Sequence, residues 1–471
     1  MHLQLGCSNS PACSGGVMIE SNRWFALLAA GPLALWGCGD DDGPTAPGPD
    51  AGMHTTSDAG GVDGGGTADD DGGTEPHEPE VTMGRLLVAD GTDAVVRVID
   101  LDDGTVHGPI AIEAAARVYA DPFARYGYAV QGSANRVHIV DSGVLFESHG
   151  DHYHIAKEAP SLLSTRLDGD RPVHFVVHGE EDTPSSWYAA SFNDGSGILD
   201  VIQERSLSTT EPRIVHVPSG RPHHGVGLVV AGHVLLSLPD PEDATASLPI
   251  GVTARAVATP DEVEDTFDGC PGLHGEAAGH ELVAFGCSDG VLFLEVHGDH
   301  FHEIKREYPG TVPDDVRVGT LAAAHDLDVV IGNWSNEGLV VIDPHAEPHF
   351  TPIPIESPVL RFALDAHGEH LVVLTADGRL HALAPTTGEP LGEPIRVIDA
   401  FAVEPGHAQV RPTFTVGAER VFVVDPRVDE VIEVELEAWA IERRIEVGGS
   451  PGSIAIFSVS PDFGEHDGHE H

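Results

Sequence analysis

Short runs of apolar and β-branched residues, each followed by Gly, Asn or Asp, recur along most of the chain. Examples are RLLVADG from residue 85, HELVAFGCSDG from residue 280 and EHLVVLTADG from residue 369. Runs of this length that end in turn residues are typical of β-strands, and no stretch has a convincing helical period. The pattern therefore predicts an all-β fold.

The spacing of these runs predicts how the strands are arranged. The runs recur at intervals of roughly 40 to 60 residues, which is the repeat length of four-stranded propeller blades. Eight repeats within residues 82–460 predict a single β-propeller with eight blades. A seven-bladed ring and a pair of β-sandwiches are the alternatives. The last run, SPGSIAIFS, has no blade of its own, so residues 451–458 are expected to pair with residues 85–90 and close the ring.

The ends of the chain differ in composition from the predicted propeller. We interpret residues 1–37 as upstream residues and a lipoprotein signal peptide that starts at Met18, because Arg23 precedes a short apolar run. LWGC before GDDDG resembles a bacterial lipobox, so Cys38 is the expected lipidation site of a periplasmic, membrane-anchored protein. Residues 38–81 are rich in Gly, Asp and Pro and are expected to form a disordered tether, and residues 461–471 a His-rich tail.

Charge and cysteine content narrow the function further. The chain has 24 Lys and Arg against 76 Asp and Glu, a net charge of -52, which disfavours nucleic acid and anionic membrane surfaces as partners and attracts cations. Solubility outside the cytoplasm is an equally good explanation of the acidity. If translation starts at Met18, the remaining cysteines are Cys38, Cys270 and Cys287. In an oxidising compartment, Cys270 and Cys287 are expected to form a disulfide.

One histidine-rich motif occurs twice, as ESHGDHYHIAKE at residues 147–158 and EVHGDHFHEIKR at residues 295–306. Gly-Asp is a typical two-residue hairpin loop, and we expect each copy where the third strand of a blade turns into the fourth. Because side chains alternate along strands, each hairpin would present three imidazoles and a carboxylate on one face, a set of ligands suited to zinc and also to copper or nickel. The predicted metal ligands are Glu147, His149, His152 and His154 in one copy, and Glu295, His297, His300 and His302 in the other. A repeated hairpin that only packs on its neighbours is the alternative.

A second set of histidines precedes or enters the innermost strands of three successive predicted blades. Innermost strands line the centre of a propeller, so these side chains could surround one ion or solute, with Glu180, Glu181 or Glu276 in reach. They could equally be satisfied by backbone carbonyls. The set consists of His174, His178, His223, His224 and His274.

The paired HGDHxH segments, RPHHGV, CPGLHGEA followed by FGC, and the blade-like repeats together resemble the AztD-type periplasmic zinc metallochaperones. The resemblance is clear over roughly residues 120–310. It implies a propeller, a zinc role for the histidines above, a Cys270–Cys287 disulfide, and transfer of zinc to the substrate-binding protein of a zinc ABC importer. Family members usually have a His-rich segment before the propeller, whereas this chain is Asp- and Gly-rich there and has a His-rich C-terminus.

We therefore expect a non-enzymatic, monomeric zinc-binding metallochaperone. The alternatives are a propeller enzyme of the lactonase or quinoprotein type, for which no trio of nucleophile, base and orienting group can be named, and a metal-free interaction scaffold. About three blades separate the two hairpins along the chain, too far to share an ion, so two separate hairpin sites produced by blade duplication are expected. These sites would lie on the face of the ring opposite to the one at which the innermost strands begin.

Overall fold

The structure, a computed structural model, describes residues 82–148, 153–180, 183–310, 317–335, 338–404, 409–417 and 419–457. The expected signal peptide, Cys38 lipidation site, tether and C-terminal tail lie outside these residues, as do His149, His152 and Glu181. Within the described ranges, no helix combines the length and the apolar character needed to cross a membrane.

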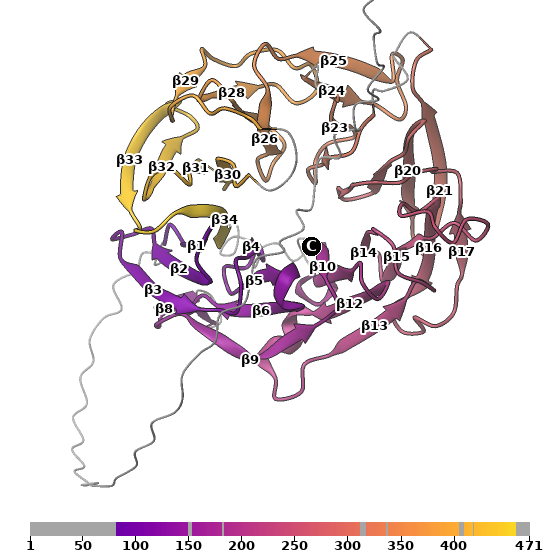
Figure 1. Cartoon of the computed structure of the whole chain (residues 1–471), viewed down its shortest axis with the longest axis horizontal. Coiled ribbons are helices and arrows are strands. Elements are labelled where there is room, and N and C mark those ends of the chain that lie inside the picture. Colours follow the sequence, from indigo (N-terminus) through magenta and orange to yellow (C-terminus); the bar gives the residue numbers. More distant parts are fainter. Residues whose placement is uncertain are drawn as a thin grey trace, which may run out of the picture. The chain divides into compact units, whose positions relative to one another are not determined.

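In the described part of the chain, the strands form eight antiparallel four-stranded sheets arranged in a ring (Figure 1). Blade 1 consists, from its innermost strand outward, of β34 (Pro451–Phe457), β1 (Arg85–Asp90), β2 (Val95–Asp100) and β3 (Val106–Ala111). Blade 2 consists of β4 (Arg117–Ala120), β5 (Tyr126–Gln131), β6 (Arg136–Asp141) and β9 (Ser161–Asp168). Blade 3 consists of β10 (Pro172–His178), β11 (Tyr188–Asn193), β12 (Ile198–Gln203) and β13 (Ile214–Pro218). Blade 4 consists of β14 (Gly227–Val230), β15 (His233–Leu238), β16 (Gly251–Ala256) and β17 (Asp265–Phe267).

The other four blades follow the same order from the centre outward. Blade 5 consists of β18 (Glu276–Ala278), β19 (Leu282–Gly286), β20 (Gly290–His297) and β21 (His300–Glu307). Blade 6 consists of β22 (Leu321–Ala322), β23 (Val330–Asn333), β24 (Gly338–Ile342) and β25 (Phe350–Pro354). Blade 7 consists of β26 (Val359–Leu364), β27 (Leu371–Thr375), β28 (Arg379–Leu383) and β29 (Ile395–Arg396), and blade 8 of β30 (Thr413–Val416), β31 (Arg420–Val424), β32 (Glu430–Glu435) and β33 (Ala440–Glu446). Among the residues that the structure describes, three short 3₁₀ helices lie between strands: η1 (Gly132–Ala134), η2 (Pro184–Ser186) and η3 (Glu204–Ser208).

The core explains why many strands read as continuous apolar runs. In β31, Val421 and Val423 pack into one hydrophobic cluster with residues of blade 7, whereas Phe422 and Val424 pack into another with residues of blade 1. Each blade is covered on both faces by its neighbours, so both faces of its middle strands must be apolar. The ring geometry therefore buries the side chains on both faces of these strands.

The expected closure of the ring is confirmed. β34 pairs antiparallel with β1, with Arg85 opposite Phe457 and Val88 opposite Ile454. Phe457 is completely buried. The first blade therefore takes its innermost strand from the other end of the propeller sequence, and the eight-bladed prediction holds.

The second HGDH copy lies where it was expected, and the first does not. β20 and β21 are the third and fourth strands of blade 5, and His297 pairs with His300 around the turn Gly298–Asp299. Gly298 has a φ of +67°, the left-handed value that a primed hairpin turn requires of its first residue. The first copy instead belongs to an extra hairpin, β7 (Val144–Ser148) and β8 (Tyr153–Lys157), which forms a separate two-stranded sheet between β6 and β9.

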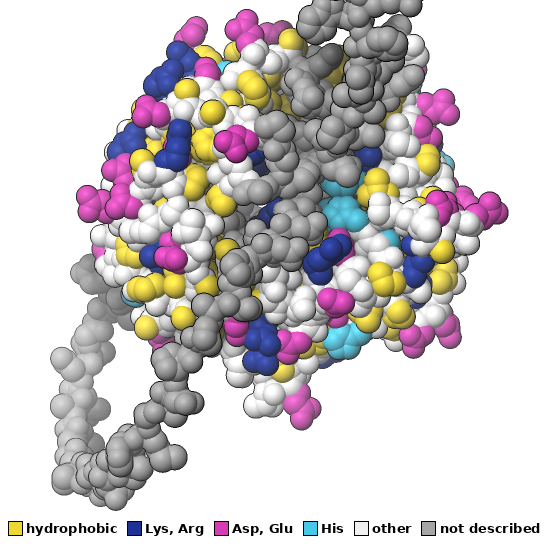
Figure 2. Space-filling model, viewed as in Figure 1, with side chains coloured by type: hydrophobic (Ala, Val, Ile, Leu, Met, Phe, Trp, Pro, Cys, Tyr) yellow, Lys and Arg dark blue, Asp and Glu magenta, His cyan; other side chains and the backbone are white. Residues whose placement is uncertain are grey.

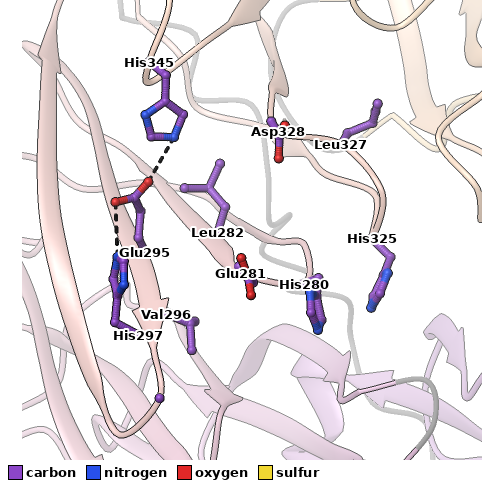
Figure 3. A pocket seen from close by; sticks show the side chains of 11 residues that line it. His280, Glu281, Leu282, Glu295, Val296, His297, His325, Leu327, Asp328 and His345 are labelled. Carbon is purple, nitrogen blue, oxygen red and sulfur yellow. Dashed lines mark ion pairs between the residues drawn. The ribbon is translucent and has the colours of Figure 1, made fainter.

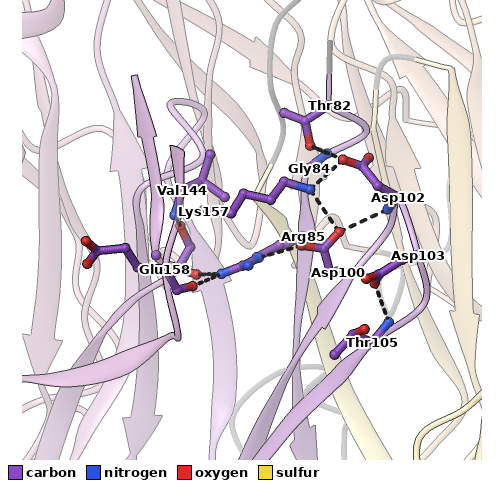
Figure 4. Close-up of polar contacts among 12 residues, drawn as sticks. Thr82, Gly84, Arg85, Asp100, Asp102, Asp103, Thr105, Val144, Lys157 and Glu158 are labelled. Carbon is purple, nitrogen blue, oxygen red and sulfur yellow. Dashed lines mark hydrogen bonds and ion pairs between the residues drawn. The ribbon is translucent and has the colours of Figure 1, made fainter. Parts of the chain in front are cut away.

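Contacts with blade 1 hold this extra hairpin in place (Figure 4). Lys157 Nζ donates to Asp100 and Asp102 at 2.9 and 2.5 Å. Arg85, itself paired with Asp100, donates to the backbone carbonyls of Ser142 and Glu158 at the base of the hairpin. The chain thus leaves the blade after β6, folds onto blade 1, and returns as β9 to supply the fourth strand. The two copies occupy non-equivalent positions, so the expectation of simple blade duplication is wrong.

The ring has two faces, which differ in the loops that they carry. We call the face at which innermost strands begin the start face, and the face at which they end the hairpin face. Third strands run parallel to innermost strands, so the turn from β20 into β21 lies on the hairpin face. In the view of Figure 2, histidine side chains are grouped beside the middle of the ring, near β10 and β14, and acidic side chains are distributed around the outline.

Candidate metal centre

Three histidines from neighbouring blades meet on the start face. His174 lies near the beginning of β10, His224 in the segment before β14, and His274 in the segment before β18. One ring nitrogen from each can be chosen so that all three lie within 4.8 Å of one another. We call this group the inner cluster. It brings together three of the five histidines that were expected near the centre of the propeller.

The nitrogens that converge are the Nε2 atoms. His224 Nε2 lies 3.4 Å from His174 Nε2 and 3.3 Å from His274 Nε2. Two ligands bound tetrahedrally to zinc at about 2.0–2.1 Å are about 3.3 Å apart. His224 Nε2 is therefore already spaced from each of the other two nitrogens as in a zinc coordination shell.

The opposite ring nitrogens determine which Nε2 atoms carry lone pairs. His274 Nδ1 lies 2.8 Å from the carbonyl oxygen of Gly319, and a carbonyl only accepts, so Nδ1 must hold the proton. His224 Nδ1 lies 2.7 Å from Asp194 Oδ2 and donates to that carboxylate in the same way. In the neutral rings, both Nε2 atoms are then acceptors that face each other at 3.3 Å. Two lone pairs at this distance repel, and a shared cation removes the repulsion.

A buried carboxylate adjoins the cluster. Glu276 Oε2 lies 3.4 Å from His174 Nδ1. It is also a buried oxygen without a hydrogen-bond partner among the residues that the structure describes. An orphaned buried carboxylate oxygen is costly unless a cation compensates it. Glu276 was one of three acidic residues expected in reach of this set, and it can either orient His174 or add a ligand.

Burial keeps the inner cluster ready to bind a cation. His274 is 3% exposed, and its burial, with the charge of His174 adding to the effect, lowers the pKa of His274 to about 4. An imidazole must be neutral to ligate a metal ion. His274 is therefore unprotonated at neutral pH and does not need to release a proton when a metal binds.

Close backbone approach brings His274 into the cluster. Gly275 has a φ of +79°, and a Cβ at this position would lie 2.4 Å from the Gly319 carbonyl oxygen that accepts from His274. Only glycine permits that approach. The expected disulfide between Cys270 and Cys287 is present and ties the loop before His274 to the end of β19. The CPGLHGEA stretch thus positions one ligand with a glycine and a disulfide.

The other predicted inner histidines lie apart from this cluster. His223 is 5% exposed, and both its nitrogens are engaged, with the Arg221 carbonyl and Ser237 Oγ. His178 lies at the far end of β10, four residues beyond His174, which is about 13 Å along a strand. Glu180, just beyond β10, is likewise at the hairpin face. The structure therefore does not bring His178, His223 or Glu180 into the inner cluster, because each occupies a different end or side of its segment.

A second group lies on the β20–β21 hairpin. Glu295 and His302 are direct cross-strand partners, and Glu295, His297 and His302 offer ligand atoms within 4.8 Å of one another. We call this the hairpin cluster. His302 Nδ1 lies 3.1 Å and His297 Nε2 3.6 Å from Glu295 Oε2. Although burial opposes it, hydrogen bonds from His302 and His297 lower the pKa of Glu295 below its usual value.

His300 has a different environment within the same hairpin. It sits opposite His297 at the tip, with the ring centroids 5.9 Å apart, and its Nδ1 lies 3.3 Å from Asp299. It is not part of the group that could hold one ion. Of the four ligands expected from this copy, the structure brings together three.

Sequence reasoning missed His345, from the loop after β24 in blade 6. Its Nε2 lies 2.9 Å from Glu295 Oε1, so the carboxylate lies between two blades (Figure 3). The stretch DPHAEPH around His345 carries a histidine next to turn residues, but no spacing rule links it to residue 295. Only the neighbouring position of blades 5 and 6 shows the contact.

In the first hairpin, the structure describes the two strands. Glu147 pairs in register with His154, as predicted, and the residues between Ser148 and Tyr153 lie outside the described part. A third group that could hold a metal, Asp365, Glu369 and His370, belongs to the turn between β26 and β27. There Asp365 accepts from the backbone N–H groups of Glu369 and His370 and pairs with the His370 ring. These hydrogen bonds stabilise the turn and explain why the three side chains lie close together.

Comparison with known proteins adds a relative of similar size. The zinc chaperone AztD of Citrobacter koseri is 28% identical over 395 residues, which cover 83% of this chain and 91% of that protein. No protein-family model matches the chain.

Solved structures agree with this relationship. Two structures of Citrobacter koseri AztD, one of them the apo form, superpose with TM-scores of 0.70 and 0.72 at 27% and 28% identity. They cover 80% and 81% of this chain, and 98% and 99% of theirs. The dihydro-heme d1 dehydrogenase NirN has a TM-score of 0.51 at 12% identity, covers 81% of this chain and 77% of its own, and shares the fold alone. The chain thus resembles AztD in both sequence and β-propeller fold over about four fifths of its length, as its HGDH, RPHHGV and CPGLHGEA stretches led us to expect.

Proposed function

We propose that this protein is a zinc chaperone that holds zinc in the inner cluster and passes it to another protein. The observation that carries the proposal is the facing pair of Nε2 lone pairs on His224 and His274, 3.3 Å apart. Three imidazoles whose ligand atoms lie within 4.8 Å of one another, with a buried carboxylate beside them, suit zinc as cargo. The similarity to a protein named a zinc chaperone supports the same function.

The inner cluster has the supporting contacts that metal-binding histidines usually have. Such histidines donate their second N–H to a carboxylate or carbonyl, which orients the ring and raises its basicity. Asp194 serves His224 in this way, and the Gly319 carbonyl serves His274. A metal-free scaffold would have no use for these convergent, preoriented nitrogens. The relative is named a chaperone and not an enzyme, which weighs against a lactonase or quinoprotein-like activity.

We further propose that the recipient is the substrate-binding protein of a zinc ABC importer, and that the chaperone acts in the periplasm as a monomer anchored through Cys38. The lipobox-like LWGC segment and the resemblance to periplasmic metallochaperones support this location. Fractionation of cells that produce the Cys38→Ala variant tests the anchor. The variant should move from the membrane to the soluble fraction, and an unchanged distribution would refute lipidation at Cys38.

Zinc binding is tested by competition with a chromophoric chelator. His224→Ala should weaken the tightest site by more than the roughly 10–100-fold expected for Asp194→Asn, which removes only the orienting carboxylate. His216→Ala is the matched control, because His216 also pairs with a buried aspartate, Asp200 at 2.6 Å, but on the outer strand β13. Equal zinc affinity in all four proteins would exclude the inner cluster as the zinc site.

Transfer is tested separately. The zinc-loaded protein is mixed with the apo substrate-binding protein, the two are separated, and their zinc is measured. If the protein is a chaperone, zinc should move to the recipient faster than it is released spontaneously to an equal amount of a chelator. Equal rates would show that the protein stores zinc and does not deliver it.

A further inference from the structure

We propose that the hairpin face carries another metal-binding position, built on His280 and His325, at which a zinc-like divalent cation stops between the hairpin cluster and the inner cluster. The proposal rests on the zinc-handling function above and adds a path to it. It uses two histidines that the sequence patterns did not single out, on the same face of the ring as His178, which the inner cluster leaves out.

His280 and His325 come from equivalent turns of neighbouring blades. His280 lies between β18 and β19 in blade 5, and His325 between β22 and β23 in blade 6. Their ring centroids are 4.4 Å apart, with the rings tilted by 41°. His325 Nδ1 lies 3.2 Å from Asp326, which can orient the ring and leave Nε2 for a ligand. Two imidazoles from different blades thus meet at the inner edge of the hairpin face.

His178 extends this pair toward the centre of the ring. It is the last residue of β10, and innermost strands end on the hairpin face, where His280 and His325 also lie. His178 and His174 are four residues apart on β10, so their side chains point to the same side of the strand. β10 therefore connects the hairpin face with the inner cluster.

An open pocket joins the pair to the hairpin cluster (Figure 3). Its lining includes His280 and His325 at one end and Glu295, His297 and His345 at the other. Glu281 and Asp328 lie between the two ends and supply carboxylate oxygens. A cation that leaves Glu295 therefore meets imidazole and carboxylate ligands without leaving the pocket.

The geometry points to a weak, rapidly exchanging position. His280 is exposed, and the pair does not belong to a group whose ligand atoms all lie within 4.8 Å among the described residues. Side chains must therefore move to complete a coordination shell, which costs affinity. In the inner cluster, in contrast, His274 is buried and its Nε2 is already spaced from that of His224 as in a zinc site. A gradient from exposed to buried ligands suits uptake from solution followed by retention.

The test compares a variant with both His280→Ala and His325→Ala to the wild type and to His367→Ala. His367 is the matched control, because it lies exposed in the equivalent turn of blade 7 and does not line the pocket. Zinc stoichiometry is measured by equilibrium dialysis, and loading of the tight site by stopped-flow transfer from a chromophoric chelator. Thermal unfolding of each protein shows whether it is folded, and His280→Gln with His325→Gln replaces the Ala pair if that pair is unfolded.

We expect the double variant to lose one weak zinc equivalent and to load its tight site about tenfold more slowly or worse, with the equilibrium affinity of that site unchanged. His367→Ala should match the wild type. If the double variant keeps wild-type stoichiometry and loading rate, the transit position does not exist, although zinc binding by the inner cluster still stands. If the wild type binds no zinc, the proposed function itself fails.

Discussion

Two carboxyl groups, Asp121 and Glu204, are buried where blades 2 and 3 meet. Tyr128 Oη donates to Glu204 Oε1 at 2.5 Å, while Glu204 Oε2 is buried without a partner among the described residues. Burial raises the pKa of Asp121 to about 7, although hydrogen bonds from the backbone N–H groups of Tyr126 and Arg125 lower it. Burial and then the charge of Asp121 raise the pKa of Glu204 well above its ordinary value. Both groups therefore bind protons more tightly in the folded protein.

This difference predicts that the contribution of the two groups to stability falls as pH rises. For an acid whose pKa is raised by folding, the stabilisation is fully present below the unfolded pKa and is lost as pH rises through the folded pKa. For Asp121 this window runs from 3.8 to about 7. Between pH 5 and 7 each of these two carboxyl groups should lower the free energy of unfolding by up to about 1.4 kcal/mol per pH unit, whereas His178 and His274, whose pKa values are lowered, act in the opposite direction.

Urea unfolding at several pH values measures this slope in the wild type and in Glu204→Gln. The amide still accepts from Tyr128 but does not titrate, so the variant should gain stability relative to the wild type as pH rises. Glu442→Gln, at an exposed position of β33, serves as the control and should follow the wild type. An equal dependence of stability on pH in all three proteins would contradict the assignment.

Single residues also separate function from packing within one motif. In RPHHGV, His224 joins the inner cluster, whereas its neighbour His223 donates from Nδ1 to the Arg221 carbonyl and accepts at Nε2 from Ser237 Oγ. A Cβ on Gly225 would lie 2.6 Å from His223 Nε2, so the glycine makes room for the buried ring. The two adjacent histidines thus have different roles. His224 is a candidate metal ligand, and His223 supports the segment that carries His224.

At the scale of elements, the disulfide-closed loop between β17 and β19 is the feature that most directly supports the inner cluster. Cys270 and Cys287 are 17 positions apart and completely buried. Within the loop, the backbone N–H of His274 donates to the Gly286 carbonyl at 2.8 Å. The disulfide therefore limits the freedom of the segment that presents His274.

Replacing both cysteines with Ala should lower the free energy of unfolding by about 3 kcal/mol, the value expected for a loop of about 15 residues. Because His274 loses part of its support, zinc affinity should also fall, while secondary structure persists. Thermal unfolding and chelator competition measure the two effects, and reduced wild-type protein should reproduce the variant. A loss of stability without any change in zinc affinity would show that the loop is held by its other contacts.

The two HGDH hairpins show how similar elements acquire different surroundings. Lys305 of the second copy contacts Asp289 and the Gly269 carbonyl next to its own blade, whereas Lys157 of the first reaches Asp100 and Asp102 in blade 1. The second copy gains His345 from blade 6. The same sequence pattern thus forms an internal pair of blade strands in one place and an added hairpin in the other.

At the scale of the whole molecule, closure through β34 decides whether the ring is one cooperative unit. Ile454, Ala455 and Phe457 contribute to the two hydrophobic clusters on either side of blade 1. Without β34, β1 becomes an exposed edge and these clusters open to water. Exposed edge strands and apolar faces favour aggregation.

A chain that ends at residue 449 should therefore lose its sharp unfolding transition and precipitate at concentrations that the intact protein tolerates. A chain that ends at residue 457 keeps β34 and is the control. Size-exclusion chromatography and thermal unfolding distinguish them. A soluble, cooperatively folded protein ending at 449 would show that seven blades and a three-stranded blade 1 suffice.

The sequence by itself determined the elements and their order. Alternating and continuous apolar runs followed by turn residues are local signals, so the strands, the Gly298–Asp299 turn and the repeat of eight blades could be predicted from the chain. The leftover final strand also predicted the ring closure, because a strand without a blade must pair with a blade without a strand. The matching positions of the two HGDH copies drew attention to Glu295, His297 and His302.

Only the tertiary structure decided which histidines meet. His174, His224 and His274 come from three blades, and their convergence depends on how blades pack around the ring, which no local pattern records. The same holds for His345 beside Glu295 and for His280 beside His325, which are contacts between neighbouring blades. Strand patterns specify the face of a sheet on which a side chain lies, whereas a metal site needs ligand atoms placed within a few ångströms by several sheets at once. That placement follows from the packing of one blade on the next, and so does the division of histidines between the two faces of the ring.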